Sequence, residues 1–197
     1  MLPARRPIRD KRQVRRKELE VDLDATAQTS ELIKRAVNGD SEAFGAIVEG
    51  HYDLIYRTAY KWCGNGADAE DVAQDVCVKL ATALRSFDGR SAFSSWLYRV
   101  TLNAVRDMQR ARVRQGRRAD ALALVSPEDA PAEQEEATAA GELWTAVRAL
   151  PDQQRDAVLL VYAEDMSHRQ AGEILGCKEA TVSWHIHEAK KTLRGLL

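Results

Sequence analysis

Cysteines and long apolar runs are both scarce in this chain. It has 3 cysteines, Cys63, Cys77 and Cys177, an odd number with no C-x-x-C spacing. A disulfide framework is therefore not indicated, and a reducing cytoplasm is expected. The longest apolar run, AVLLVYA at 157–163, is too short to cross a bilayer, and the charged N-terminus lacks the apolar stretch of a signal peptide. We therefore expect a cytoplasmic protein with no membrane insertion.

An overall excess of one charge is also missing. The net charge is −1 although 30% of the residues are charged, so the whole molecule has no electrostatic attraction to nucleic acid. The charges are nevertheless segregated along the chain. Basic residues crowd positions 5–17 and 99–118, whereas positions 119–142 hold acidic residues and no basic one. Any binding to DNA must therefore use separate basic surfaces.

Strand patterns are absent as well, since no segment alternates with period two. The sequence predicts an all-α protein of two small helical bundles joined by a flexible acidic linker. Ser30, Ser41 and Asp68 are the predicted N-caps of the first three helices. The predicted parts are a basic disordered arm (1–29), the first bundle (30–118), the linker (119–141) and a second bundle with a helix-turn-helix (142–197).

The stretch AFSSWLYRVTLNAVRDMQRAR, residues 92–112, is predicted to form one amphipathic helix. Its apolar stripe is Phe93, Leu97, Val100, Ala104, Met108 and Ala111, and its polar face carries Arg99, Asn103, Arg106 and Arg110, flanked by Trp96 and Asp107. Arginine binds phosphate in a planar fork, asparagine reads base edges, and tryptophan stacking contributes roughly 1–3 kcal/mol per base. This face is a candidate platform for unpaired DNA. The alternative is an ordinary solvated face, with Trp96 packed under a loop.

The preceding helix has an apolar stripe and an acidic face. Val72, Val76, Leu80 and Leu84 step by four and form the predicted inner side. Asp68, Asp71 and Asp75 are spaced by three and four and are predicted to share the exposed side with Gln74. Such a face suits a basic protein partner. A divalent-metal site for phosphate-ester hydrolysis is an alternative, but no general base or glycine-rich phosphate loop accompanies the carboxylates.

The segment SHRQAGEILGCKEATVSWHIHEAKKTL, residues 167–193, has the layout of a helix-turn-helix. Ser167 and Gln170 predict a capping box, Gly172 marks a close approach of two helices, and Gly176 marks a turn with positive φ. The inner stripe is Val182, Ile186, Ala189 and Leu193, and the outward residues are Ala180, Ser183, Trp184, His187 and Lys191. The alternatives are an αα-hairpin without a DNA role and a zinc site of His168, Cys177, His185 and His187. Two histidines two residues apart on one helix diverge too far to share an ion.

Three ordered motifs resemble the extracytoplasmic-function (ECF) sigma factors of bacterial RNA polymerase. They are DAEDVAQDV (68–76), FDGRSAFSSWLYRVTLNAVRD (87–107), and LPDQQRDAVLL followed by SHRQAGEILG and TVSWHIHEAKK. The resemblance covers roughly residues 40–115 and 142–195. It implies that the first bundle, sigma region 2, docks on the clamp helices of core RNA polymerase and opens the minus-ten promoter element. The second bundle, region 4, would hold the minus-thirty-five element as duplex.

The resemblance implies three sets of site residues. The polymerase-binding set is Asp68, Asp71, Gln74 and Asp75; the minus-ten set is Phe87, Asp88, Arg90, Trp96, Arg99, Asn103, Arg106 and Arg110; the minus-thirty-five set is Arg169, Lys178, Thr181, Ser183, Trp184, His187, Lys190 and Lys191. The expected partners are core RNA polymerase, promoter DNA and an anti-sigma factor. No catalytic residue, metal or cofactor is expected, and the protein is not expected to be an enzyme.

The recognition helix departs from the family pattern. It reads TVSWHIHEAKK where the family often has T-V-K-S-R with further arginines. Fewer basic residues predict fewer phosphate contacts and a shallower salt dependence. The rival function is a helix-turn-helix regulator that binds duplex DNA without joining the polymerase.

Overall fold

The computed structural model describes the backbone of residues 27–122 and 139–195, and the side chains of 27–115 and 141–195. Over these ranges the chain forms helices and no strand, which confirms the all-α prediction. None of the helices described is long and apolar enough to span a membrane. Residues 1–26 of the predicted arm and 123–138 of the predicted linker lie outside the described residues.

The chain divides into two compact units, Met1–Glu49 and Gly50–Leu197. In the first unit, residues 27–37 are helical and end at a turn in which Gly39 has φ of +94°. A positive φ favours glycine, so Gly39 allows the turn that ends this helix. The predicted N-cap Ser30 is wrong, because Ser30 lies inside the helix.

Helix α2 (Ser41–Cys63) begins in the first unit and continues into the second. Asp40, rather than the predicted Ser41, caps it: Asp40 Oδ1 accepts hydrogen bonds from the backbone amides of Ala43 and Glu42, at 3.0 Å each. The Ala43 amide and the Arg35 side chain lower the pKa of the Asp40 carboxyl. The residue before the predicted cap therefore satisfies the free amides at this helix end.

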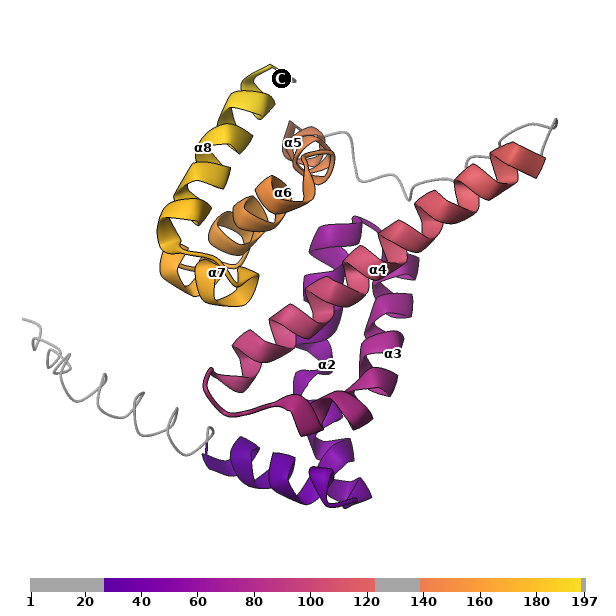
Figure 1. The fold of residues 1–197 in the computed structure, drawn as a ribbon, viewed down its shortest axis with the longest axis vertical. Helices are drawn as coiled ribbons and strands as arrows, with labels where there is room; N and C mark the ends of the chain where they lie inside the picture. The colour runs from indigo at the N-terminus through magenta and orange to yellow at the C-terminus, as the bar shows by residue number, and fades with distance from the viewer. Residues whose placement is uncertain (1–26, 123–138, 196–197) are drawn as a thin grey trace, which may run out of the picture. The chain divides into compact units, whose positions relative to one another are not determined.

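The second unit contains the remaining helices, which Figure 1 shows in chain order. They are α3 (Gly66–Ala83), a 3₁₀ turn (Leu84–Ser86), α4 (Phe93–Leu122), α5 (Ala139–Arg148), α6 (Asp152–Val158), a π-helical segment (Leu159–Ala163), α7 (His168–Leu175) and α8 (Glu179–Arg194). Helix α3 packs on α4, while α8 packs on α6 and α7. Helix α4 also contacts α7, so residues of the two predicted bundles meet within this unit.

The predicted apolar stripe is fully buried on the α3 side but only partly buried on α4. All four residues of the predicted stripe are buried: Val72, Val76 and Leu80 in α3, and Leu84 in the 3₁₀ turn that follows it. On α4, Phe93, Leu97 and Ala104 are buried as predicted, but Val100, Met108 and Ala111 are only half-buried. Leu102 and Val105 are buried in addition. Because α4 contacts both α3 and α7, its buried arc differs from the single stripe that periodicity predicts.

The helix-turn-helix is built as the sequence predicts. Ser167 and Gln170 form a complete capping box at the start of α7. Gly176 ends α7 with φ of +69°, in the left-handed region. A Cβ on Gly172 would lie 2.8 Å from the backbone oxygen of Cys177, so only glycine fits there without a shift of the backbone. Val182 of α8 is fully buried, which fixes the register of the second helix.

Candidate nucleic-acid interface

The acidic surface on α3 is smaller than predicted. Asp71, Gln74 and Asp75 are exposed, whereas Asp68 is only 7% exposed and does not belong to this surface. Asp75 pairs with Lys79 one helical turn away, at 2.6 Å. The three exposed side chains form a continuous polar patch on one side of α3.

Asp68 instead joins α3 to α4. Its carboxylate accepts two hydrogen bonds from the Arg112 guanidinium and one from Asn65 Nδ2, at 2.9 Å for the latter. Burial alone raises the pKa of the Asp68 carboxyl, but the hydrogen bonds from Arg112 and Asn65 outweigh it, and its pKa lies below the usual value. The predicted cap at Asp68 is also wrong: Asn65 is the N-cap of α3 and accepts from the Asp68 amide at 2.8 Å.

Glu70 lies beside the acidic surface and was not singled out from the sequence. Its Oε1 accepts hydrogen bonds from Tyr52 at 2.8 Å and from Gln74 at 3.0 Å. The Gln74 and Tyr52 hydrogen bonds lower the pKa of Glu70. Gln74 is thus held by its neighbour one turn back, and the i,i+4 spacing of Glu70 and Gln74 was the available signal.

The aromatic side chains before and at the start of α4 form one cluster. The ring centroids of Phe87, Phe93 and Trp96 lie 5.4 to 5.5 Å from one another. Trp96 is only 8% exposed and contacts Phe87, so the alternative in which Trp96 packs under the loop is confirmed, and its ring is not an open stacking surface. In that loop Asp88 and Arg90 are exposed, and Asp88 Oδ1 accepts from the Arg90 amide at 3.1 Å.

The polar side of α4 is exposed at three of its four predicted positions. Arg99, Asn103 and Arg110 are exposed, and Arg110 donates to Asp107 at 2.8 Å. The Arg106 side chain is only 27% exposed, because it turns toward a carboxylate on α6. We call Arg99, Asn103, Arg106 and Arg110 the α4 ridge.

Asp156 and Glu164 each accept a hydrogen bond from one side chain of α2 and one side chain of α4. Asp156 is fully buried and accepts from Trp62 Nε1 at 2.7 Å and from Arg106 Nε at 3.0 Å. Glu164, just after the π-helical segment, accepts from Lys61 Nζ at 2.7 Å and from the Tyr98 hydroxyl at 2.8 Å. Burial and this hydrogen bond raise the pKa of Tyr98. Sequence reasoning missed these contacts, because they join residues far apart in the chain.

The outward face of α8 carries most of the predicted duplex-binding residues. Ser183, Trp184, His187, Lys190 and Lys191 are exposed, as are Arg169 on α7 and Lys178 before α8, while Thr181 is half-buried. The His168 ring nitrogen Nδ1 lies 2.8 Å from Ser183 Oγ, which ties the start of α7 to this face. His185 points inward and is 7% exposed.

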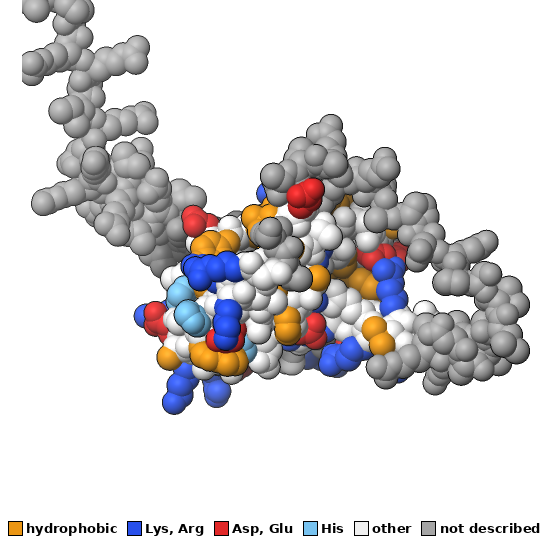
Figure 2. Space-filling view, turned by 90° about the horizontal axis from the view of Figure 1, so that it is seen from above, with side chains coloured by type: hydrophobic (Ala, Val, Ile, Leu, Met, Phe, Trp, Pro, Cys, Tyr) orange, Lys and Arg blue, Asp and Glu red, His pale blue; other side chains and the backbone are white. Residues whose placement is uncertain are grey.

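Basic charge on the described surface is interspersed with other side chains. In the face that Figure 2 views, Lys and Arg lie beside Asp, Glu and apolar side chains. Arg169 pairs with Glu173 at 3.2 Å, and Lys190 lies 5.3 Å from the centre of the Tyr162 ring. The expected shallow salt dependence of DNA binding stays a prediction.

A metal centre is not formed by the described side chains: within 27–115 and 141–195, no three His, Cys, Asp or Glu residues gather as ligands. The three cysteines are half-buried and unpaired. Burial raises the pKa of the Cys63 thiol to about 12. That thiol therefore stays protonated near neutral pH.

Comparison with known proteins identifies the family. The sigma-70 region 2 family matches residues 47–115, and the sigma-70 region 4 family matches residues 140–193. The chain is 31% identical over 176 residues to the ECF RNA polymerase sigma factor SigW of Bacillus subtilis (strain 168), covering 82% of this chain and 92% of that protein. The chain belongs to the ECF sigma factors.

Other relatives agree with this assignment. The sigma factor is 29% identical over 181 residues to the RNA polymerase sigma-H factor of Pseudomonas aeruginosa, covering 84% of this chain and 92% of that protein. Its fold resembles CnrH, solved in complex with the cytosolic domain of CnrY, with 26% identity, a TM-score of 0.58, and coverage of 86% and 96%. It also resembles the fold of the sigma factor RpoE, solved with the anti-sigma factor NepR from Bartonella quintana, with 24% identity, a TM-score of 0.59, and coverage of 78% and 95%.

The two family matches include the surfaces described above. The region 2 match contains α3 and the α4 ridge, and the region 4 match contains the helix-turn-helix. The protein is therefore an RNA polymerase sigma factor, a transcription initiation factor, and the reading as a separate DNA-binding regulator is not favoured.

Proposed function

We propose that this sigma factor binds core RNA polymerase through the exposed side of α3. Asp71, Gln74 and Asp75 form the contact surface, since they are exposed side chains of the predicted polymerase-binding set. Asp68 would not contact the polymerase. It is a structural residue, because its carboxylate accepts two hydrogen bonds from Arg112. A basic polymerase surface would gain charge-assisted hydrogen bonds from these side chains.

The α4 ridge is proposed to hold the separated minus-ten strand. Arg99 and Arg110 would contact phosphates, and Asn103 would read a base edge, since all three reach solvent from one side of a helix whose other side is buried. This combination is the single observation that carries the proposal. Asp88 and Arg90, exposed in the loop before α4, would add contacts to the same strand. Stacking of a base on Trp96 would require its ring to leave Phe87 and Phe93.

Helix α8 is proposed to enter the major groove of the minus-thirty-five element. Its N-terminal half presents Thr181, Ser183 and Trp184, and its C-terminal half presents His187, Lys190 and Lys191. Trp184, with 57% of its surface exposed, offers an apolar contact to a thymine methyl group or to the sugar-phosphate edge. Arg169 and Lys178 would contact phosphates beside the groove.

The proposed partners are core RNA polymerase, promoter DNA and an anti-sigma factor. Solved relatives are complexed with the anti-sigma factor NepR and with the cytosolic domain of CnrY, which supports the last of these. We also propose a cytoplasmic location, no cofactor and no catalytic turnover by the isolated chain. The boundaries 30–118 and 142–197 for the two functional regions are part of the same proposal.

A binding experiment with and without core enzyme tests this function. Genomic fragments would be incubated with the purified sigma factor alone, with core polymerase alone and with both, and the retained fragments sequenced. Specific retention is expected only when both proteins are present. Specific retention by the chain alone would favour a duplex-binding regulator.

A further inference from the structure

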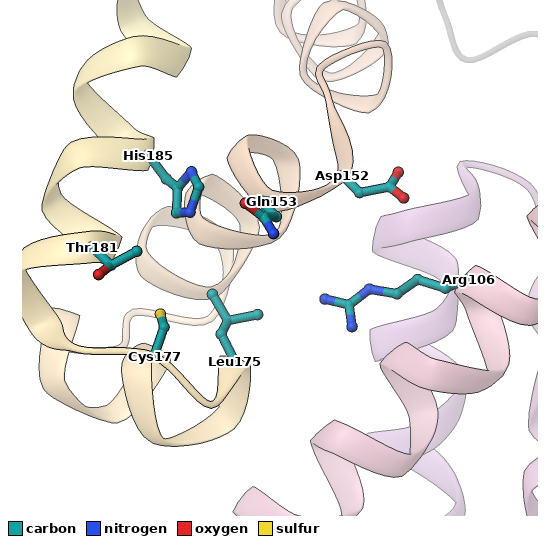
Figure 3. Close-up of a pocket in the computed structure, with 7 residues that line it drawn as sticks. All are labelled: Arg106, Asp152, Gln153, Leu175, Cys177, Thr181 and His185. Atoms are coloured by element: carbon teal, nitrogen blue, oxygen red, sulfur yellow. The ribbon is translucent and has the colours of Figure 1, made fainter.

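Ser183 carries the exposed hydroxyl group in the N-terminal half of α8. The other hydroxyl residue of this half, Thr181, is half-buried and lines a cavity of about 310 Å³ together with Cys177 and His185 (Figure 3). A hydroxyl group can donate one hydrogen bond and can also accept hydrogen bonds. Which of these Ser183 offers to a base depends on how the protein already uses its hydroxyl.

Two groups of the protein contact the Ser183 hydroxyl oxygen. Ser183 Oγ donates to the backbone oxygen of Glu179, about one helical turn back, at 3.1 Å. His168 Nδ1, at the start of α7, lies 2.8 Å from the same Ser183 oxygen. Serine has a single hydroxyl hydrogen and two lone pairs, so these two contacts leave few ways for Ser183 to bind a base.

Ser183 can offer only a lone pair to a base in either tautomer of His168. If Nδ1 carries a hydrogen, His168 donates to Ser183, and the Ser183 hydrogen goes to the Glu179 oxygen. If Nδ1 carries none, its lone pair and the Glu179 oxygen are both acceptors, and the single Ser183 hydrogen goes to one of them. In each case the hydroxyl hydrogen is used inside the protein. Ser183 therefore faces solvent as an acceptor.

An acceptor at this position selects one kind of base edge. In the major groove, adenine N6 and cytosine N4 are amino donors, whereas guanine presents acceptors at N7 and O6, and thymine presents one at O4. A serine with a free hydrogen contacts either kind, but Ser183 as held here contacts an amino group. The pattern T-V-K-S-R, frequent in the family, has lysine in place of Ser183, and lysine can only donate.

We propose that Ser183 reads the minus-thirty-five element as an acceptor, through the amino group of one adenine or cytosine, and that His168 is the positioning residue that holds its hydroxyl for this contact. This inference rests on the proposed function of α8. His168 belongs to the first turn of α7, and α7 packs closely on the turn before α8 at Gly172. His168 thus reaches Ser183 from a packed helix.

Selection from a promoter library locates the contacted base. Fragments with a randomised minus-thirty-five element are incubated with core polymerase and the sigma factor, and the retained fragments are sequenced for the wild type, Ser183→Ala and Thr192→Ala. Thr192 is the matched control, because its hydroxyl also donates to the backbone oxygen four residues back at 3.1 Å, and it lies outside the proposed DNA-binding set. Alanine at exposed positions of a helix keeps the fold.

One position of the element is expected to lose its base preference in Ser183→Ala and to keep it in Thr192→Ala. If the wild type retains a preferred sequence that Ser183→Ala leaves unchanged at every position, this inference is overturned while the proposed function stands. If the wild type with core polymerase retains no preferred sequence, the proposed function itself is refuted.

Base analogues at that position determine the direction of the hydrogen bond. One promoter lacks the amino group of the selected base pair, with purine in place of adenine or 2-pyrimidinone in place of cytosine. A second promoter lacks N7 of the same pair, with the 7-deaza form of its purine base. Loss of the amino group is expected to weaken binding about fivefold more for the wild type than for Ser183→Ala, the size of one hydrogen bond. Loss of N7 should affect both proteins equally.

Two results with these analogues would overturn acceptor readout. One is an equal effect of amino-group loss on the wild type and on Ser183→Ala. The other is an effect of N7 loss that is present in the wild type and absent in Ser183→Ala, because Ser183 would then donate its hydrogen to the base.

Two variants of His168 test its positioning role with the same promoters. His168→Ala removes the contact with Ser183 and is expected to reduce the amino-group effect to about twofold or less. His168→Asn places an amide that can donate or accept near the position of Nδ1, and it is expected to restore most of the effect. An undiminished effect in His168→Ala would overturn the positioning role. Failure of His168→Asn to restore a lost effect would also overturn it.

Discussion

Arg112 of α4 binds the carboxylate of Asp68, in the first turn of α3, through two hydrogen bonds. The Asp68 side chain is nearly buried and the Arg112 side chain is half-exposed. Asp68→Asn is expected to lower the free energy of unfolding by about 1–2 kcal/mol. This loss is smaller than the loss from breaking a fully buried ion pair, because water hydrates the unpaired Arg112. Urea unfolding at pH 7 measures the change. The control Asp53→Asn, at an exposed position of α2, should stay within about 0.5 kcal/mol of the wild type.

The same pair predicts a pH dependence. The pKa of Asp68 is lowered in the folded protein, so the pair stabilises the fold above the unfolded-state pKa of about 3.9 and loses this contribution as pH falls through the folded-state value. The difference in unfolding free energy between the wild type and Asp68→Asn should therefore shrink between pH 6 and pH 3. A difference that stays constant over this range would show that the pair does not stabilise the fold through ionisation.

Asp75→Lys reverses one charge on the proposed polymerase-binding surface. The substitution also removes the exposed pair with Lys79, which contributes only about 0.3–0.5 kcal/mol, so the fold should remain intact. Affinity for core polymerase is expected to fall at least tenfold, measured by fluorescence anisotropy of labelled sigma factor. Asp53→Lys introduces the same charge change on α2 and should bind core enzyme normally. Equal affinities for wild type and Asp75→Lys would remove α3 from the interface.

Asn103→Ala removes the proposed base-reading group from the α4 ridge. Asn103 is exposed and makes only a long contact with Arg106, at 3.4 Å, so truncation should cost little stability. Loss of one base contact of about 1–3 kcal/mol predicts at least a fivefold decrease in promoter opening, measured by permanganate reactivity of unpaired thymines. Affinity for core polymerase should not change. Thr82→Ala, an exposed substitution on α3, serves as the control. A parallel loss of core binding would mark Asn103 as a structural residue.

Gly172→Ala and Gly45→Ala should change stability in opposite directions. A Cβ at residue 172 would lie 2.8 Å from a backbone oxygen, so the turn of the helix-turn-helix must shift, at a cost of about 1–3 kcal/mol. A Cβ at residue 45 meets nothing within 4 Å, and removing glycine from the interior of α2 stabilises it by roughly 0.5–1 kcal/mol. Thermal unfolding of both variants measures the difference. Equal shifts would contradict the close approach of α7 to the turn.

Local signals predicted the helix-turn-helix in detail. The capping box of Ser167 and Gln170, the tight contact at Gly172 and the positive φ of Gly176 all lie within ten residues, so chain-local rules are enough to find them. The buried face of α3 was predicted for the same reason, since its apolar residues recur at the helical repeat. The polar residues predicted on the opposite sides of these helices are exposed where they have no partner far away in the sequence, as at Asp71 and Ser183.

Long-range contacts account for the errors. Asp68 was predicted to be exposed, but Arg112 lies 44 positions later and reaches it only because α4 folds back along α3. Trp96 flanks the polar face and is a predicted minus-ten residue, but Phe87, nine positions earlier in the chain, packs against its ring. The partial burial of Arg106 depends on Asp156, 50 positions away. Neither helical periodicity nor a short motif encodes such pairings.

In vitro transcription with core polymerase on a library of genomic fragments tests the central claim most directly. The account predicts that adding the purified sigma factor produces transcripts with defined 5′ ends, and that those start sites share elements at minus ten and minus thirty-five. Asn103→Ala should reduce these transcripts while Thr82→Ala leaves them unchanged. Transcripts that are the same with and without the sigma factor would contradict the account.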